Sequence, residues 1–163
     1  MKLYLNHTER YPVEQLQMQL FASEASEFVT APFADGENGA VSGLFTGKKY
    51  VTATAKISWN GKTGRAAKRL LREQADVRHT RRILQQSYYL AAMQVLDTVP
   101  PWGALSGVRP SKLSTKALLA GKTRRQAEWE LEREFFVTPE RAKLCVDASE
   151  HTVEAMNLLA PRD

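Results

Sequence analysis

The sequence predicts an α+β fold, in which a β-α-β-β-α unit with a small antiparallel sheet is followed by an all-helical extension. Three observations support this prediction. Apolar and polar residues alternate strictly over residues 50–59, which is typical of a half-buried strand. Residues 65–99 contain neither glycine nor proline and carry an apolar stripe at helical spacing. Two further helix starts, each with capping residues, follow near Thr123 and Thr138.

The first elements in chain order are a short strand, a helix and a hairpin. We expect the strand over residues 2–6. Apolar spacing, with Pro12 in the first turn, predicts a helix over residues 11–24. Residues 30–39 are rich in turn formers and are expected to form a loop. The alternating strand at residues 50–59 is then expected to pair with residues 40–46.

A long helix is expected to complete the first unit. Asn60-Gly61 ends the alternating strand, and the helix is predicted over residues 65–99. It forms either one helix or two with a break near Asp76–Thr80, where Thr80 is a candidate cap. The buried stripe consists of Leu84, Tyr88, Ala91 and Val95.

Three helices are predicted in the remainder of the chain. The first covers residues 112–120 and ends at Gly121, a residue typical of the position after a helix. Thr123 and Gln126 form a capping box for the second helix. The third begins at Thr138-Pro139 and extends to about residue 158. We therefore divide the chain into an α+β unit, residues 1–99, and a helical extension, residues 100–163.

Composition limits the classes of function. The only cysteine, Cys145, allows no internal disulfide, and one thiol provides no structural zinc or iron–sulfur site. The three histidines form no pair with ligand spacing, so we assign no metal to this chain. We expect no membrane span, because no apolar run approaches the ~18 residues that one requires. A cytoplasmic protein is expected, since the N-terminus turns polar too early for a secretory signal.

Positive charge is concentrated in one segment. The net charge of the chain is +5, but residues 48–82 hold 11 basic and 2 acidic side chains, a local charge of +9. Within the predicted helix, four basic residues at helical spacing share one face: Arg65, Lys68, Arg69 and Arg72. This face either binds an anion, such as a nucleic acid, a phosphate or a polycarboxylate, or is a solvated surface.

The segment Pro100–Leu113, PPWGALSGVRPSKL, is the second candidate site. Arg109 and Lys112 flank a helix N-terminus, where free backbone N–H groups favour an anion. The alternative is that Pro110 stiffens the helix entry and Arg109 pairs within its own domain. Trp102 is expected to fill the core. Gly103 and Gly107 are expected to serve backbone torsion or close packing, because their spacing is not that of a P-loop.

This segment also resembles a family motif. Pro101–Lys112 is similar to the PWG-x-L-[ST]-G-[VI]-RP-x-K motif in the N-terminal region of HemZ-type, oxygen-independent coproporphyrinogen dehydrogenase-like radical SAM proteins. Residues Arg141–Leu144 also resemble that family's segment before the catalytic barrel. The resemblance is specific over residues 80–160 and weak over residues 1–79.

The resemblance implies a catalytic partner domain. In that family, a barrel with a CxxxCxxC motif follows a segment like Ala160–Asp163. The motif binds a four-iron four-sulfur cluster that cleaves S-adenosylmethionine. By resemblance, the parent protein oxidatively decarboxylates two propionates of coproporphyrinogen III in haem synthesis. The chain would then be its N-terminal domain, catalytically inert alone and without a cofactor of its own.

Three hypotheses remain open from the sequence. The chain is an accessory domain that docks on its own radical SAM barrel and helps to hold an anionic tetrapyrrole. Alternatively, it is a nucleic-acid-binding module that uses the basic segment, although no stacking-aromatic motif lies beside that segment in the sequence. The third hypothesis is a purely structural domain, in which the motif is a stiff corner.

Overall fold

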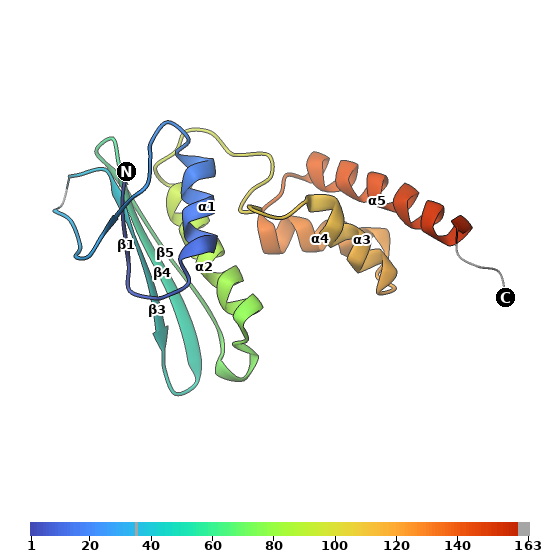
Figure 1. Cartoon of the computed structure of the whole chain (residues 1–163), viewed down its shortest axis with the longest axis horizontal. Helices are drawn as coiled ribbons and strands as arrows, with labels where there is room; N and C mark the ends of the chain where they lie inside the picture. Colours follow the sequence, from blue (N-terminus) through green and yellow to red (C-terminus); the bar gives the residue numbers. More distant parts are fainter. Residues whose placement is uncertain (35, 160–163) are drawn as a thin grey trace. The chain divides into compact units, whose positions relative to one another are not determined.

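The computed structural model describes residues 1–34 and 36–159 and divides into two compact units, Met1–Val99 and Pro100–Asp163. The first unit contains a sheet with helices and the second contains helices, so the predicted α+β class is confirmed. Figure 1 labels the α-helices of both units and the strands of the first unit other than Glu27–Val29. Among the described residues, no helix is both long enough and apolar enough to span a membrane.

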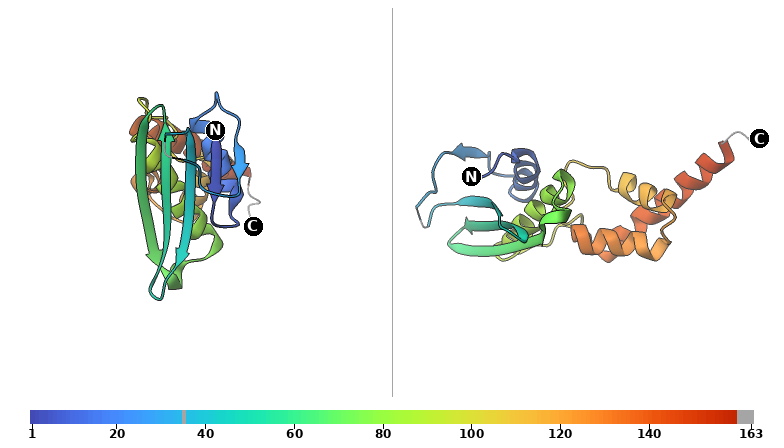
Figure 2. Two further views of the ribbon diagram at one scale, coloured as in Figure 1. Left: turned by 90° about the vertical axis from the view of Figure 1, so that its left-hand side faces the viewer. Right: turned by 90° about the horizontal axis from the view of Figure 1, so that it is seen from below.

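The first unit, here the sheet unit, contains five described strands and two α-helices. The strands are β1 (Lys2–Leu5), β2 (Glu27–Val29), β3 (Gly39–Thr46), β4 (Tyr50–Trp59) and β5 (Lys62–Leu71). Helix α1 (Arg10–Leu20) follows β1, and a 3-10 turn (Arg72–Gln74) leads from β5 into α2 (Val77–Ala92). Both helices lie on the same side of the sheet (Figures 1 and 2).

The sheet is mixed rather than antiparallel, in the order β2-β1-β3-β4-β5. Strand β1 runs parallel to both β2 and β3, because α1 carries the chain back across the sheet between β1 and β2. The pairs β3–β4 and β4–β5 are antiparallel hairpins. The predicted hairpin is therefore present as β3–β4, within a sheet that is larger than expected.

The predicted helix over residues 65–99 is wrong at both ends, since its first part is a strand and α2 ends at Ala92. Residues 62–71 form β5, which pairs with β4 along its whole length. Asn60 and Gly61 have φ values of 48° and 77°, the left-handed geometry of a two-residue hairpin turn. The helix begins only at Val77, and its cap is Asp76, which accepts a hydrogen bond from the His79 N–H, rather than Thr80.

The core of the sheet unit lies between the sheet and α2. Alternate β4 residues are buried there, as the sequence pattern predicts: Val51, Ala53, Ala55 and Ile57. The predicted stripe is also confirmed, since Leu84, Tyr88, Ala91 and Val95 are buried. Gly64 of β5 faces the end of α2, where a Cβ would lie 2.1 Å from the Ala91 carbonyl oxygen. The strand and the helix therefore approach more closely than any side chain allows.

A buried polar network connects α1 to α2. The Tyr88 hydroxyl donates to Gln17 Oε1 at 2.8 Å, and Gln17 Nε2 donates to Ser26 Oγ at 2.9 Å and to the Met1 carbonyl oxygen at 3.3 Å. Both Tyr88 and Gln17 are fully buried. Burial raises the pKa of the Tyr88 hydroxyl well above its usual range, so it remains a neutral donor.

Replacing Tyr88 with phenylalanine should lower the free energy of unfolding by about 2 kcal/mol, because it leaves Gln17 Oε1 buried without its donor. Urea unfolding of the whole chain measures this change. Tyr11→Phe is the matched control, since Tyr11 is exposed and should give a change near zero. Equal effects of the two substitutions would contradict a stabilising role for the network.

The second unit, here the helical unit, contains α3 (Pro110–Leu119), α4 (Arg124–Phe135) and α5 (Pro139–Leu159). The capping box of Thr123 and Gln126 is confirmed, with both reciprocal hydrogen bonds present. Arg124 at the start of α4 pairs with Asp147 and Glu150 of α5. The buried core consists of Leu105, Ala117, Ala127, Leu131, Val137, Ala142, Cys145 and Val146.

Candidate anion-binding face of the sheet

The four basic residues assigned to one helix face do not share a face. Side chains alternate along β5, so Arg65 and Arg69 lie on one side of the sheet and Lys68 lies on the other, toward the helices. Arg72 lies beyond the strand, at the start of the 3-10 turn, with Nη1 3.5 Å from the Gly47 carbonyl oxygen. The prediction that the four residues share a helix face is therefore wrong. Of the four, only Arg65 and Arg69 lie on the same side of the sheet.

Arg65 and Arg69 lie on the side of the sheet that neither α1 nor α2 covers, which we call the open face. The register places Lys56 of β4 opposite Arg65, and Thr52 opposite Arg69. The Arg69 guanidinium lies over the Tyr50 ring, with its carbon 4.6 Å from the ring centroid. A cation over the face of an aromatic ring is attracted to that ring. Tyr50 therefore favours this position of the Arg69 guanidinium on the open face.

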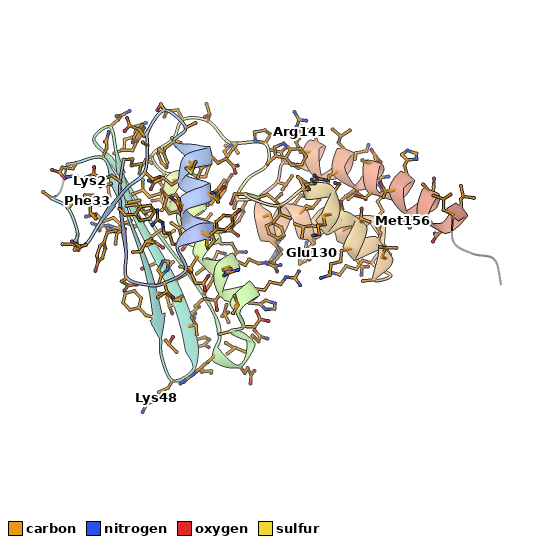
Figure 3. All side chains as sticks on the ribbon, viewed as in Figure 1. Lys2, Phe33, Lys48, Glu130, Arg141 and Met156 are labelled. Carbon is orange, nitrogen blue, oxygen red and sulfur yellow. The ribbon has the colours of Figure 1, made fainter. Side chains whose placement is uncertain are left out.

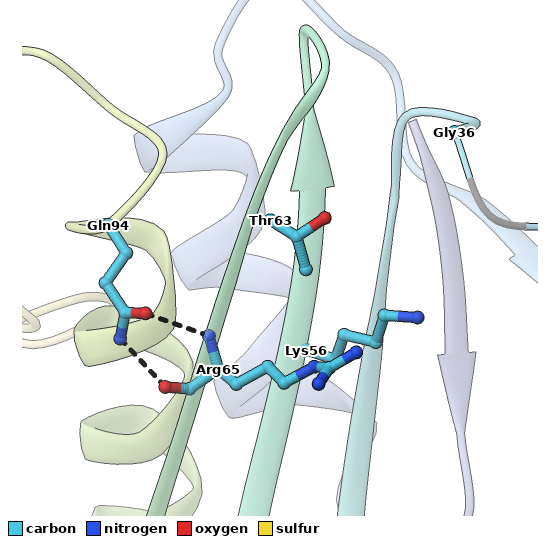
Figure 4. A pocket seen from close by; sticks show the side chains of 5 residues that line it. All are labelled: Gly36, Lys56, Thr63, Arg65 and Gln94. Atoms are coloured by element: carbon cyan, nitrogen blue, oxygen red, sulfur yellow. Dashed lines mark hydrogen bonds between the residues drawn. The ribbon is translucent and has the colours of Figure 1, made fainter.

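A depression of about 460 Å³ lies at the Lys56–Arg65 end of the open face. It is lined by Gly36, Lys56, Thr63, Arg65 and Gln94, and Figure 4 shows the Lys56 and Arg65 side chains side by side. A carboxylate or phosphate between the two side chains would lie beside two cations, and the arginine can hold it through two hydrogen bonds.

Gln94 holds the outer edge of this depression. Its Oε1 accepts a hydrogen bond from the Arg65 N–H at 3.1 Å, and its Nε2 donates to the Arg65 carbonyl oxygen at 2.8 Å (Figure 4). The amide thus pairs with the β5 backbone in the way that a neighbouring strand would. This contact fixes the backbone from which the Arg65 side chain extends.

Two aromatic rings lie on the open face beside the basic residues, and neither was predicted from the sequence. Gly39 and Gly43 of β3 have no side chain, and a Cβ on either would lie within 3 Å of an aromatic ring: Phe33 over Gly39 and Phe45 over Gly43. Register places Val41, between these glycines, opposite Lys56. Phe45 lies two residues after Gly43 in β3, so only the alternation of side chains along a strand could have placed it on this face. Phe33, which Figure 3 labels, lies in a loop that precedes the strand.

Arg109 and Lys112 lie in the helical unit. Arg109 is the N-cap residue of α3, and both side chains are exposed. The Arg109 side chain makes no capping hydrogen bond, and Pro110 occupies the first turn. Arg109 and Lys112 remain a predicted anion site at a helix start.

Trp102 and Gly103 are engaged within the helical unit. The Ala104 N–H donates to the Phe135 carbonyl oxygen at 2.7 Å, and the Thr138 N–H donates to the Pro101 carbonyl oxygen at 3.0 Å. Gly103 has φ +56°, and a Cβ there would lie 2.2 Å from the Phe135 carbonyl oxygen. Gly107 also has positive φ, +68°. Trp102 packs against the core of the unit. The start of the motif therefore anchors the connection between α4 and α5.

Cys145 lies in the core of the helical unit, between α3 and α5. Its Sγ is 3.2 Å from Ser114 Oγ, which in turn is 2.6 Å from Ser149 Oγ. Burial raises the pKa of the Cys145 thiol, which disfavours the reactive thiolate. Among the described residues, no three or more His, Cys, Asp or Glu side chains gather in a way that would hold a metal ion.

Comparison of the chain with protein-family models, curated proteins and solved structures finds no match in any of the three.

Proposed function

We propose that this chain is the non-catalytic N-terminal region of a cytoplasmic, oxygen-independent coproporphyrinogen III oxidase-like radical SAM protein. In this role it docks on its own C-terminal barrel and helps to hold an anionic tetrapyrrole. The resemblance of Pro101–Lys112 to the family motif supports the kinship. The observation that supports the binding role is the Lys56–Arg65 pair in the depression on the open face.

The chemistry of this pair suits a propionate group. Two cations from neighbouring strands, held by a rigid hairpin, match a carboxylate better than a neutral ligand. Thr63 adds a hydroxyl to the same depression. The implied iron–sulfur cluster does not fit the residues present, because the family motif requires three cysteines and the single cysteine here is buried in the helical core.

The binding role is tested by titrating the chain with coproporphyrin III and following porphyrin fluorescence. The double variant Lys56→Ala/Arg65→Ala should bind about tenfold more weakly, the loss expected for a charge-assisted contact. Lys143→Ala, which removes an exposed cation from α5, is the matched control and should bind as the unchanged chain does.

Two outcomes would contradict this assignment. If Arg109→Ala or Lys112→Ala weakens binding and the double variant does not, the anion site lies at the start of α3 instead of on the sheet. If none of these variants changes the affinity, the tetrapyrrole role is wrong. The kinship has a separate test, since a reading frame that continues past residue 163 without a CxxxCxxC motif would contradict it.

The geometry favours a structural role for the start of the motif. Both backbone hydrogen bonds and the close approach at Gly103 serve the α4–α5 connection. The two basic residues of the motif, Arg109 and Lys112, are exposed and could contact a ligand.

A further inference from the structure

The hairpin that forms one half of the open face has an unbalanced charge. Residues 48–72 contain eight lysine and arginine side chains and neither aspartate nor glutamate. They form β4, β5 and the turns at their ends. Lys62 pairs with Asp97 at 2.8 Å, but the hairpin still carries a large excess of positive charge, and one carboxylate ligand neutralises only part of it. A ligand with many regularly spaced anionic groups complements it more completely.

The aromatic rings on the neighbouring strand add a second kind of contact. Phe33 and Phe45 lie against Gly39 and Gly43, so each ring rests on the backbone of β3. Phe45 nevertheless remains 53% exposed, which leaves ring surface for a planar partner. Gly39 and Gly43 are four residues apart, so the two rings rest on backbone positions separated by about 13 Å.

Polar groups fill the space between the rings and the cations. Thr52 and Thr54 of β4 lie opposite Phe45 and Gly43 on the open face, and both are partly exposed. Their hydroxyls both donate and accept hydrogen bonds. The open face thus presents, in adjacent rows, aromatic rings on β3, hydroxyls and Lys56 on β4, and Arg65 and Arg69 on β5.

We propose that the open face of β3, β4 and β5 binds single-stranded nucleic acid. Proteins that bind single strands combine a basic track for the backbone with aromatic side chains on which bases stack, and an uncovered sheet is one known platform for this combination. A duplex suits the face less well, since its bases are stacked inside and do not reach Phe33 or Phe45. This binding goes beyond the proposed tetrapyrrole role, although both ligands would use Arg65.

The test is fluorescence anisotropy with a labelled short oligouridine and the whole chain at low salt. We expect binding that weakens as salt rises, linearly on logarithmic axes. Arg65→Ala/Arg69→Ala should weaken binding and reduce that salt dependence. Phe45→Ala, which leaves the charge unchanged, should weaken binding about tenfold through the loss of base stacking. Tyr11→Ala, on an exposed ring of α1, is the matched control and should have no effect.

Other probes show whether the affinity is specific to single strands. Equal affinity for heparin, together with no effect of Phe45→Ala in a variant of unchanged circular dichroism, would reduce the interaction to charge alone and overturn the proposal. Equal affinity for a duplex of the same length would also overturn it. If the chain binds coproporphyrin III and no oligonucleotide, this inference fails and the proposed function stands. The reverse result would remove the tetrapyrrole role alone.

Discussion

Replacing Gly103 with alanine should lower the free energy of unfolding of the helical unit by about 4 kcal/mol. The new Cβ would lie 2.2 Å from the Phe135 carbonyl oxygen and 2.3 Å from the Phe136 carbonyl oxygen. Both are backbone atoms, which cannot rotate away as a side chain does. The φ value of +56° adds torsional strain for any residue with a Cβ. For a unit of this size, the loss is a large share of its total stability.

Hydrogen exchange followed by mass spectrometry measures the effect within each unit. Amides of α3, α4 and α5 should lose protection, whereas those of β4 and α2 should keep it. Gly121→Ala is the matched control, because Gly121 also has positive φ, +82°, but a Cβ there would meet no other described group within 4 Å. It should cost only about 1 kcal/mol. Equal costs at the two positions would mean that torsion alone, and not the contact with the α4–α5 connection, requires Gly103.

The sequence predicted those elements whose local pattern agrees with their final environment. The alternation of β4 follows from its burial on one face, and the Thr123–Gln126 capping box is a purely local structure. Residues 65–71 were predicted to be helical because they contain neither glycine nor proline and carry basic residues at helical spacing. Pairing with β4 through the Asn60-Gly61 turn makes them a strand instead. The Asn60-Gly61 turn was the one local signal for the hairpin. The helical spacing of the basic residues after it favoured a helix instead.

The candidate site was harder to predict than the fold, because its residues become neighbours only through the register between paired strands. Arg65 was identified from its charge, but its partner Lys56 is nine residues away in sequence and adjacent only through the β4–β5 pairing. Phe33 reaches the open face from a loop, and its position depends on the missing side chain of Gly39. The Gln94 side chain forms two hydrogen bonds with the backbone of Arg65 in β5. No spacing pattern in the sequence predicts this contact. Because residues 65–71 were predicted to be a helix, Lys68 was placed on the same face as Arg65 and Arg69. In the strand, it lies on the opposite face.

The second large effect is expected at Gly64, where alanine should lower the free energy of unfolding of the sheet unit by about 3 kcal/mol. Its Cβ would lie 2.1 Å from the Ala91 carbonyl oxygen and 2.9 Å from the Gln94 Cβ, so α2 would have to move away from β5. Urea unfolding measures the loss. Movement of Gln94 should also release its contacts with the Arg65 backbone, which faster hydrogen exchange of the Arg65 amide would detect.

Gly43→Ala is the matched control for Gly64→Ala, because it makes the same change on the other face of the same sheet. Its Cβ would meet Thr54 Oγ1 at 2.7 Å and Phe45 Cε2 at 2.8 Å, and both are side-chain atoms that rotate aside. The cost should therefore be about 1 kcal/mol. Exchange of the Arg65 amide should not change in this variant. If Gly43→Ala destabilises the unit as much as Gly64→Ala, or if the Arg65 amide remains protected in Gly64→Ala, the close approach of α2 is not what holds the β5 edge and the adjacent depression in place.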